Sequence, residues 1–311
     1  MEPQTSPAAA SAPVILAATD FSQTAAAALD WAFELARQQG ARVELVHAVV
    51  LPNLAPSALT PVTYALPGVG FEADVLKAAE TRLAEAAAAA REKGVEVATF
   101  IVAGNPSRVI LDRAEALPAT AIVMGTRGLT GLRHLLMGRT TQRVVHGAHC
   151  PVLAVHPEDL GKHRAIRTIL VPTDFSQDAD LAIHAAHRLL AAMEQDARLI
   201  LLHAYNLPIE YTAYGPIPTS INFLEDKGLE AERRLYELAQ TLQREGLTVE
   251  TVSREGDPAH VIAEEAQERG ADLIAMGTRG ESGLRHLLLG STAERVVEYA
   301  PCPVMTIRRP E

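Results

Sequence analysis

"GTRGESGLRHLLLGST", residues 277–292, has a close copy in "GTRGLTGLRHLLMGRT", residues 125–140. Twelve of the sixteen letters are identical. The repeat extends far beyond the glycines, because "ILVPTDFSQ" at residues 169–177 matches "ILAATDFSQ" at residues 15–23. These matches keep their order along the chain at nearly constant offsets. The chain is therefore a duplication of one complete structural unit.

The length of the chain agrees with two domains. A chain of 311 residues is too long for one typical core and suits two domains of about 150 residues each. A polar stretch without an apolar period separates the two copies, which is typical of a linker. We expect a disordered tail at 1–13, a first domain at 14–157, a linker at 158–166 and a second domain at 167–311.

The composition excludes several classes of protein. Hydrophobic residues make up 48% of the chain and charged residues 21%, with a net charge of −10 and no basic cluster. A nucleic-acid partner is therefore not expected. No apolar run approaches the ~18 residues of a membrane span, and the start lacks the features of a secretory signal. We expect a cytoplasmic protein with no membrane partner.

The two cysteines, Cys150 and Cys302, occupy the same place in each copy, at the entry to an apolar strand. Neither has the neighbouring cysteine or histidine spacing that holds a metal. We expect them to be plain buried thiols, because a free cysteine behaves as a small hydrophobic residue.

Short apolar runs alternate with helical patterns in each half. In the second half "TILVP", "RLILLHA", "LTVETVS", "ADLIAMG" and "PVMTI" are strand candidates, and a long helix is expected at 222–245. Apolar strands without alternation are typical of parallel sheets covered on both faces. The pattern predicts two tandem doubly wound α/β domains, each with helices on both faces of a parallel sheet. Ligands of such sheets lie outside the carboxyl ends of the strands, where the "TD" motif and the glycine stretch both fall.

The glycine stretch has two interpretations. Gly277 and Gly280 follow a strand, and Gly290 with Ser291 opens the last helix. Glycines let backbone amides approach an anion, and a helix N-terminus attracts phosphate; Ser291 could cap that helix or bind a phosphate oxygen. Alternatively, the glycines serve only turns and helix ends. Neither GxxxxGK[ST] nor a GxGxxG after the first strand is present.

Two pairs of polar residues stand at strand ends. Asp20 and Asp174 follow the first strand of each half, where a carboxylate either caps the next helix or faces a ligand. His47 and His203 lie in apolar strands, which favours histidines that are satisfied inside the core. A catalytic role would need a nearby acid or base partner, and no pattern supplies one.

The sequence resembles the ATP-binding branch of the universal stress protein family. The glycine stretch at 277–291 fits the G-x2-G-x9-G-[S/T] pattern of that branch, and "VPTDFS", "LLHA" and "PCPVM" stand at its strand signatures. The resemblance covers nearly all of both halves. It implies a five-stranded sheet of order 3-2-1-4-5 in each half. It also implies pairing of the last strands, here "VLAVH" with "VMTIR" inside one chain, and a homodimer is a further possibility.

The resemblance implies ATP, with Mg²⁺, as the ligand of the second half. Asp174 would face the ribose or Mg²⁺, and the backbone at Ala204 would read the adenine. The complete set implied for the second half is Pro172, Thr173, Asp174, Ala204, Gly277, Arg279, Gly280, Gly290, Ser291 and Thr292.

The first half departs from the pattern at two places. Arg139 stands where the second half has Ser291, and Ala18 stands where it has Pro172. The arginine could pair with a phosphate or fill the phosphate pocket, so the second half is expected to be the principal site. The equivalent set is Ala18, Thr19, Asp20, Ala48, Gly125, Arg127, Gly128, Gly138, Arg139 and Thr140.

Further candidates lie in loops. The spacer of each glycine stretch carries an Arg-His pair, either solvated or in contact with the γ-phosphate or a partner. Long loops at 51–70 and 206–220 are candidates for lids, with tyrosines that could cover a nucleotide. These residues are Arg133, His134, Arg285, His286, Tyr64, Tyr211 and Tyr214.

The first functional hypothesis is a cytoplasmic stress-response protein that binds ATP as a regulatory ligand, with no dedicated catalytic residue. Two alternatives stay open. One is a slow ATPase or nucleotidyl transferase on the same site, which would need a positioned base. The other is a pseudo-dimeric interaction protein that binds no nucleotide.

Overall fold

The computed structural model describes residues 12–50, 71–128, 137–161, 166–191, 197–206, 209–212, 215–218, 221–280 and 289–309. The elements of the first half are β1 (Val14–Ala18), α1 (Gln23–Gln39), β2 (Arg42–Val49), α2 (Phe71–Glu92), β3 (Val97–Ala103), α3 (Pro106–Ala116), β4 (Ala121–Gly125), α4 (Arg139–Gly147) and β5 (Val152–Val155). A short 3₁₀ turn follows at Pro157–Asp159. The elements of the second half are β6 (Thr168–Pro172), α5 (Gln177–Ala191), β7 (Arg198–Tyr205), β8 (Ile209–Thr212), β9 (Gly215–Pro218), α6 (Ile221–Arg244), β10 (Thr248–Glu255), α7 (Pro258–Glu268), β11 (Leu273–Gly277), α8 (Ser291–Tyr299) and β12 (Val304–Ile307).

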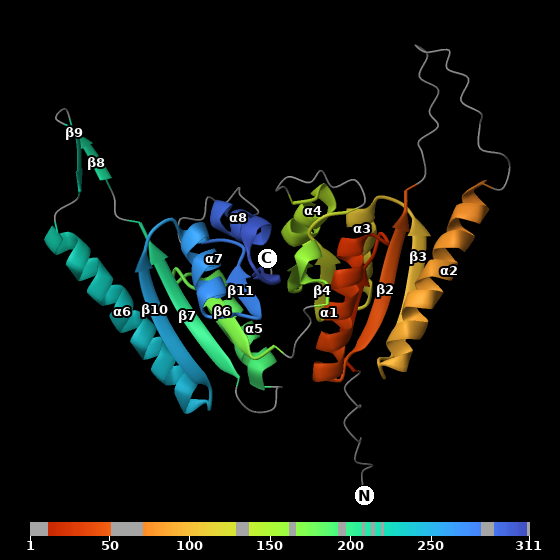
Figure 1. Cartoon of the computed structure of the whole chain (residues 1–311), viewed down its shortest axis with the longest axis horizontal. Helices are drawn as coiled ribbons and strands as arrows, with labels where there is room; N and C mark the ends of the chain where they lie inside the picture. Colours follow the sequence, from red (N-terminus) through yellow and green to blue (C-terminus); the bar gives the residue numbers. More distant parts are fainter. Residues whose placement is uncertain are drawn as a thin grey trace, which may run out of the picture.

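Ten strands form one continuous sheet in the order β10-β7-β6-β11-β12-β5-β4-β1-β2-β3 (Figure 1). Within each half, neighbouring strands are parallel and follow the order 3-2-1-4-5. The predicted α/β fold and strand order are confirmed. The first strand of each half lies at the centre, so the turn that follows it opens at the switch point of the sheet.

The two halves meet through their last strands. β12 pairs with β5 in the antiparallel direction, with Met305 opposite Leu153 and Thr306 opposite Val152. This confirms that the two domains pair inside one chain. The pairing removes two apolar sheet edges that would otherwise be open to association.

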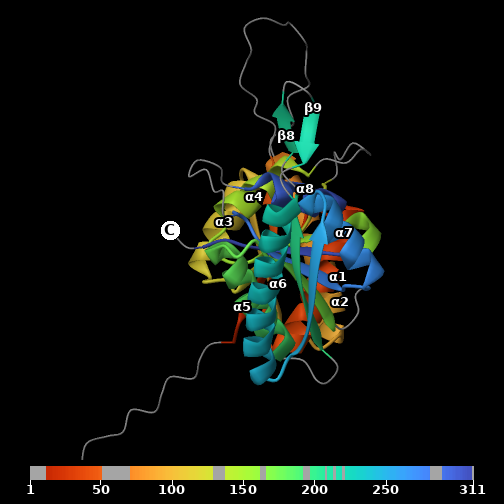
Figure 2. The same ribbon diagram turned by 90° about the vertical axis from the view of Figure 1, so that its left-hand side faces the viewer.

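The core has two layers, one on each face of the sheet. Helices α1, α2, α5 and α6 cover one face, with Leu83 and Leu235 among their buried side chains. Helices α3, α4, α7 and α8 cover the other face, with Ile110 and Ile262 among theirs. Figure 2 shows the sheet between these layers, seen from the α6 side. Each apolar cluster includes residues of both halves, so the seam interrupts neither layer.

Local signals set the helix ends. Asp257 accepts a hydrogen bond from the His260 amide at 3.1 Å and caps α7, whose first position is the predicted Pro258. Ser22 caps α1 in the same way, with its hydroxyl 3.1 Å from the amide nitrogen of Ala25. Proline is favoured at the first position of a helix because the N–H that proline lacks would have no hydrogen-bond partner within the helix at that position.

The loop predicted at 206–220 contains regular structure. β8 and β9 form a two-stranded antiparallel hairpin, which projects beyond the end of the sheet in Figures 1 and 2. Each strand has only four residues, so the alternation of apolar and polar residues is too short to be recognised among the prolines of this segment. The side chains of Tyr211 and Tyr214 lie outside the described residues, as do Tyr64 and the four spacer residues Arg133, His134, Arg285 and His286.

The predicted linker is more than a solvated tether. Asp159 is 2% exposed, and its carboxylate accepts the backbone N–H of His156 at 2.9 Å. At its other end Ile166 is 1% exposed. Both ends of the linker thus carry buried residues, and the carboxylate near its start is buried with a hydrogen-bond partner. The first eleven residues of the predicted tail lie outside the described part of the chain.

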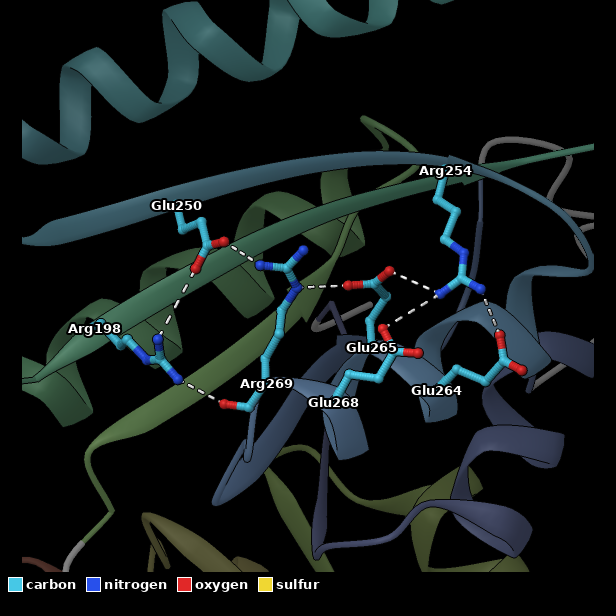
Figure 3. A network of polar contacts seen from close by, with 7 residues as sticks. All are labelled: Arg198, Glu250, Arg254, Glu264, Glu265, Glu268 and Arg269. Carbon is cyan, nitrogen blue, oxygen red and sulfur yellow. Dashed lines mark hydrogen bonds and ion pairs between the residues drawn. The ribbon is translucent and has the colours of Figure 1, made fainter.

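The two outer edges of the sheet differ. Edge strand β10 is tied to β7 and α7 by a chain of ion pairs (Figure 3), whose central carboxylate, Glu265, lies between Arg254 and Arg269. Its members are Arg198, Glu250, Arg254, Glu264, Glu265, Glu268 and Arg269. In the first half, where β3 is the edge strand, the ion pair of Arg113 with Glu44 ties α3 to β2, the strand next to that edge. Among the described residues, no helix is long and apolar enough to cross a membrane.

Candidate functional site

A pocket of about 320 Å³ lies at the carboxyl ends of β6, β7 and β11. The N-terminal turns of α7 and α8 complete its walls. All ten second-half residues of the predicted set line this pocket. The full lining is Pro172, Thr173, Asp174, Ala179, Leu202, Ala204, Pro258, Ile262, Met276, Gly277, Thr278, Arg279, Gly280, Gly290, Ser291, Thr292 and Ala293.

One side of the pocket is apolar. Leu202 of β7, Ile262 of α7 and Met276 of β11 contribute buried side chains to it. Pro258 adds a rigid ring at the start of α7. Sequence reasoning missed the α7 residues, although "GDPAHVI" repeats "GNPSRVI" of the first half. The repeat could have been read as a second contribution to the site.

The turn after β6 holds Thr173 and Asp174. Thr173 donates its N–H to Leu202 O at 2.8 Å, and its Oγ1 accepts the Phe175 N–H at 3.0 Å. Asp174 Oδ1 accepts the Ser176 N–H at 3.1 Å. The carboxylate therefore orders its own turn and is not the cap of α5. The alternative that Asp174 is a helix cap is wrong, because Ser176 accepts the Ala179 N–H.

The three glycines of the stretch pack closely against their surroundings. A Cβ at Gly277 would lie 2.7 Å from the backbone carbon of Asp178 in α5, and one at Gly280 would lie 2.5 Å from Asp174 Oδ2. A Cβ at Gly290 would approach Thr278 O to 3.3 Å. None of these glycines has a positive φ, so turn conformation is not the reason for glycine. The glycine loop therefore packs closely against the turn after β6, against α5 and against itself.

The same packing recurs in the first half. A Cβ at Gly125 would lie 2.7 Å from Thr24 Cγ2, and one at Gly128 would lie 2.6 Å from Asp20 Oδ2. Asp20 also accepts its Ser22 N–H, at 3.0 Å, and the N-cap of α1 is Ser22. Asp20 is therefore not a helix cap either.

Helix α8 presents its N-terminus to the pocket. Its N-cap is Gly290, and within the described part of the chain no side chain caps it. The prediction that Ser291 could cap this helix is wrong, since Ser291 is its first residue and exposed. The first N–H groups of a helix carry roughly half a positive charge. Among the described residues, no side chain competes for these N–H groups.

Thr278 carries a buried hydroxyl that the sequence did not single out. The residue is 1% exposed, and its Oγ1 has no hydrogen-bond partner among the described residues. Its carbonyl accepts the Gly290 N–H at 2.7 Å, which closes the glycine loop. Thr126 repeats the buried, unpartnered hydroxyl in the first half. Among the described residues both hydroxyls therefore keep unused hydrogen-bonding capacity, which is costly in a buried position.

The first half differs where the sequence differs. Arg139 is the first residue of α4, and its side chain is exposed. Thr141, which stands where the second half has Ala293, donates its hydroxyl to Gly125 O at 2.8 Å. Arg127 lies 3.8 Å from Glu158. In the first half, the glycine loop therefore makes polar contacts with other side chains of the protein, Thr141 at Gly125 and Glu158 at Arg127.

His47, His203 and Cys150 are half-buried, whereas Cys302 is buried. His47 and His203 each place Nδ1 at 2.8 Å from the carbonyl of Thr19 or Thr173, so both are satisfied as predicted, although half-buried. Both cysteines are free thiols. Burial raises the pKa of Cys150 to about 11 and that of Cys302 further still, so neither is a reactive thiolate at neutral pH.

Metal ligands are sparse. In the described ranges, no group of three or more histidine, cysteine, aspartate or glutamate side chains could hold a metal ion. Asp174 is the one carboxylate among the described residues that line the pocket. The pocket alone is therefore no metal cage.

Known proteins resemble the chain over its whole length. The model of the universal stress protein family matches residues 13–156 and 165–308. A universal stress protein of Mycolicibacterium smegmatis is 28% identical, covering 94% of this chain and 96% of that protein. One from Thermus aquaticus is 37% identical over 46% of this chain and 98% of its own length.

A solved structure extends the likeness to the fold. The crystal structure of a universal stress protein from Archaeoglobus fulgidus superposes with a TM-score of 0.73 at 22% identity. It covers 96% of this chain and 98% of its own. Both halves match the family model, and the tandem relative matches end to end. The chain therefore belongs to the universal stress protein family and consists of two of its domains in tandem.

Proposed function

We propose that the second domain binds ATP with Mg²⁺ as a regulatory ligand of a cytoplasmic stress-response protein. One observation carries the proposal. An apolar slot ends against a glycine loop, beside a helix N-terminus and a buried hydroxyl to which the described residues give no side-chain cap and no hydrogen-bond partner. A nucleotide matches this arrangement, because its flat base suits an apolar slot and its phosphates suit backbone amides, a helix N-terminus and a hydroxyl.

The apolar end of the pocket suits the nucleoside. Its volume of about 320 Å³ lies within the roughly 300–1,000 Å³ range of small-molecule sites. Leu202, Ile262 and Met276 offer apolar contacts to a planar ring from three different elements. The backbone at Ala204, the last lining residue of β7, offers polar groups to its edge.

The other end suits phosphates. Amides of the first turn of α8 provide donors and a positive dipole end, Arg279 provides a cation and Thr278 a hydroxyl. With a net charge of −10, the whole protein repels a polyphosphate. The attraction must therefore be local, which suits a tight loop of amides better than a basic surface.

Asp174 is the residue that would hold Mg²⁺. Magnesium in nucleotide sites is usually bound by one or two carboxylates together with the phosphates, so a single carboxylate fits. When bound, Mg²⁺ neutralises phosphate charge. A regulatory ligand is proposed because, among the described residues, the lining offers no second acid or base beside Asp174.

The second domain is proposed as the principal site. The first half keeps equivalent apolar residues at Val46, Ile110 and Met124, all buried. It differs at the loop, where Thr141 bonds to Gly125 O and Arg139 replaces a serine. Calorimetric titration of nucleotide-free protein with Mg·ATP counts the sites: one per chain supports the proposal, and two would show that Arg139 is compatible with binding.

Thr278→Val provides a sharper test. Valine keeps the shape of threonine and removes an unpaired buried hydroxyl, so the free energy of unfolding should rise by about 1 kcal/mol. If the hydroxyl serves the nucleotide, the affinity for Mg·ATP should fall roughly tenfold, the worth of one hydrogen bond. Urea unfolding and calorimetry measure the two changes on the same protein.

Thr126→Val is the matched control, because Thr126 is the same buried hydroxyl in the first half. It should give a similar gain in stability and leave the second-half affinity unchanged. Binding by Thr278→Val at the affinity of the parent chain would contradict the role given to the hydroxyl. Absence of any Mg·ATP binding by the parent chain would overturn the proposed function itself.

A further inference from the structure

Behind the pocket, three side chains from separate elements form a stack. The guanidinium carbon of Arg234, on α6, lies 4.2 Å from the centre of the Phe175 ring. The Phe175 ring lies 4.8 Å from the ring of His203, on β7, at a tilt of 34°. None of the three residues lines the pocket. A cation over an aromatic face within about 6 Å is an attractive contact.

The first half contains the same stack. Arg82 lies 4.3 Å from the centre of the Phe21 ring, and Phe21 lies 4.4 Å from His47 at a tilt of 37°. The two copies agree within a few tenths of an ångström, although much of the surrounding sequence differs. The arrangement therefore belongs to the unit that was duplicated.

Phe175 is held in an unusual backbone conformation. Its φ is 64°, as is that of Phe21, and both are non-glycine residues in the left-handed region. That conformation is unfavourable for a residue with a side chain, because the Cβ crowds the following carbonyl oxygen. Residues held in this way need support from their surroundings and concentrate at functional sites. Contacts with Arg234 and His203 supply such support to Phe175.

Hydrogen bonds join the stack to the pocket wall. His203 Nδ1 lies 2.8 Å from Thr173 O. Since a carbonyl oxygen only accepts, Nδ1 must carry the proton and donate it. Phe175 in turn donates its N–H to Thr173 Oγ1. Thr173 and the following Asp174 line the pocket, and Asp174 Oδ2 lies 2.5 Å from the position that a Cβ on Gly280 would take.

We propose that Arg234, Phe175 and His203 position the Thr173–Asp174 turn for ligand binding without touching the ligand. His203 Nδ1 donates a hydrogen bond to the Thr173 carbonyl. The Phe175 ring packs between Arg234 and His203, and these contacts stabilise the left-handed backbone conformation of Phe175, directly after Asp174. The Asp174 carboxylate is thereby kept against the glycine loop. This role deepens the proposed nucleotide site and rests on it for its binding readout.

The test compares two changes at His203 in the full chain. His203→Leu removes the donor to Thr173 O, whereas His203→Asn keeps an N–H at the position of Nδ1. Two readouts are taken: amide hydrogen exchange of Phe175 and Ser176 in nucleotide-free protein, and calorimetric titration with Mg·ATP. We expect His203→Leu to speed the exchange and weaken binding, each roughly tenfold, the worth of one hydrogen bond. His203→Asn should stay within about threefold of the parent chain for both.

His47→Leu is the matched control, because it breaks the same bond in the first half. It should lower stability to a similar degree and leave the exchange of Phe175 and Ser176 unchanged. If His47→Leu speeds that exchange equally, the effect is general destabilisation and the positioning role is overturned. The role is also overturned if His203→Leu exchanges and binds like the parent chain, or if His203→Asn fails to rescue.

The exchange readout separates this proposal from the nucleotide site. If the parent chain binds no Mg·ATP, the proposed function is lost. Faster exchange at Phe175 and Ser176 in His203→Leu, absent in His203→Asn, would still establish that the stack orders the turn. Unchanged exchange would overturn the stack even if the parent chain bound the nucleotide.

Discussion

Single residues of the glycine loop serve packing as much as ligand approach. Gly277 lies against the backbone of α5, and Gly280 against the carboxylate of Asp174. A side chain at either position would push apart elements that form the pocket floor. Glycine is therefore favoured here by packing inside the protein. Considering the loop only as a set of backbone amides that approach a ligand overlooks this packing.

Gly277→Ala should lower the free energy of unfolding by about 1–3 kcal/mol, because its Cβ meets α5 backbone that cannot rotate away. Gly228→Ala in α6 is the control: nothing lies within 4 Å of its Cβ, and alanine in a helix interior should add about 0.5–1 kcal/mol. Urea denaturation of both variants checks the contrast. Equal behaviour of the two would contradict the steric account.

The candidate residues were predictable from sequence to different degrees. Asp174 and Gly290 were found because the repeat and the strand ends mark them. Thr278 was missed because nothing in its letter reveals a buried hydroxyl without a partner. Ile262 was missed because its place in the wall depends on how α7 packs across the sheet.

At the scale of elements, the ion-pair network on β10 fixes an edge strand that has no neighbour on its outer side. Glu265 is its centre, with a side chain 5% exposed. Burial opposes ionisation of Glu265, but hydrogen bonds from Arg269 and Arg254 outweigh it and hold the pKa below its usual value. The network could not be predicted from the repeat, since the first half has a different solution in Arg113 and Glu44.

A lowered folded-state pKa means that Glu265 stabilises the fold above the unfolded pKa of about 4.3. This contribution is lost as the pH falls through the folded pKa. Glu265→Gln should therefore lower the free energy of unfolding at pH 7 by roughly 1–3 kcal/mol and flatten its decline in acid. Urea unfolding between pH 7 and pH 3 measures both effects.

Glu268→Gln provides the comparison, because Glu268 is 66% exposed and 3.9 Å from Arg254. Exposed pairs of this kind contribute about 0–1 kcal/mol, so this variant should follow the parent curve. An acid limb of Glu265→Gln as steep as that of the parent chain would show that other carboxylates cause the decline.

At the scale of the whole molecule, the seam between the two halves pairs equivalent strands, β5 and β12. The side chains that meet there nevertheless differ in charge between the halves. Gln142 on α4 donates to Glu294 on α8 at 3.0 Å, and the two residues occupy equivalent positions of the repeat. Glu298 accepts the Met137 N–H. The duplication and sheet order were predictable from sequence and resemblance, but these contacts were not, because each depends on the partner half.

Gln142→Glu should place a carboxylate opposite Glu294 and lower the free energy of unfolding by about 1 kcal/mol at low salt, less at high salt. Adding Glu294→Gln removes the repulsion and should restore part of the loss, the remainder reflecting the nearby Glu298. Urea unfolding of the single and double variants at two salt concentrations provides the measurement. A double variant no more stable than the single one would exclude the pairing as the cause.

The antiparallel contact of β5 and β12 joins two domains that the same chain already tethers. Two separate chains that associate in this way part when they are diluted, because mass action favours the free subunits. Here the local concentration of one domain around the other is fixed by the tether. The contact between the two domains is therefore independent of protein concentration. The distance between the two glycine loops is likewise the same at low and at high concentrations of the protein.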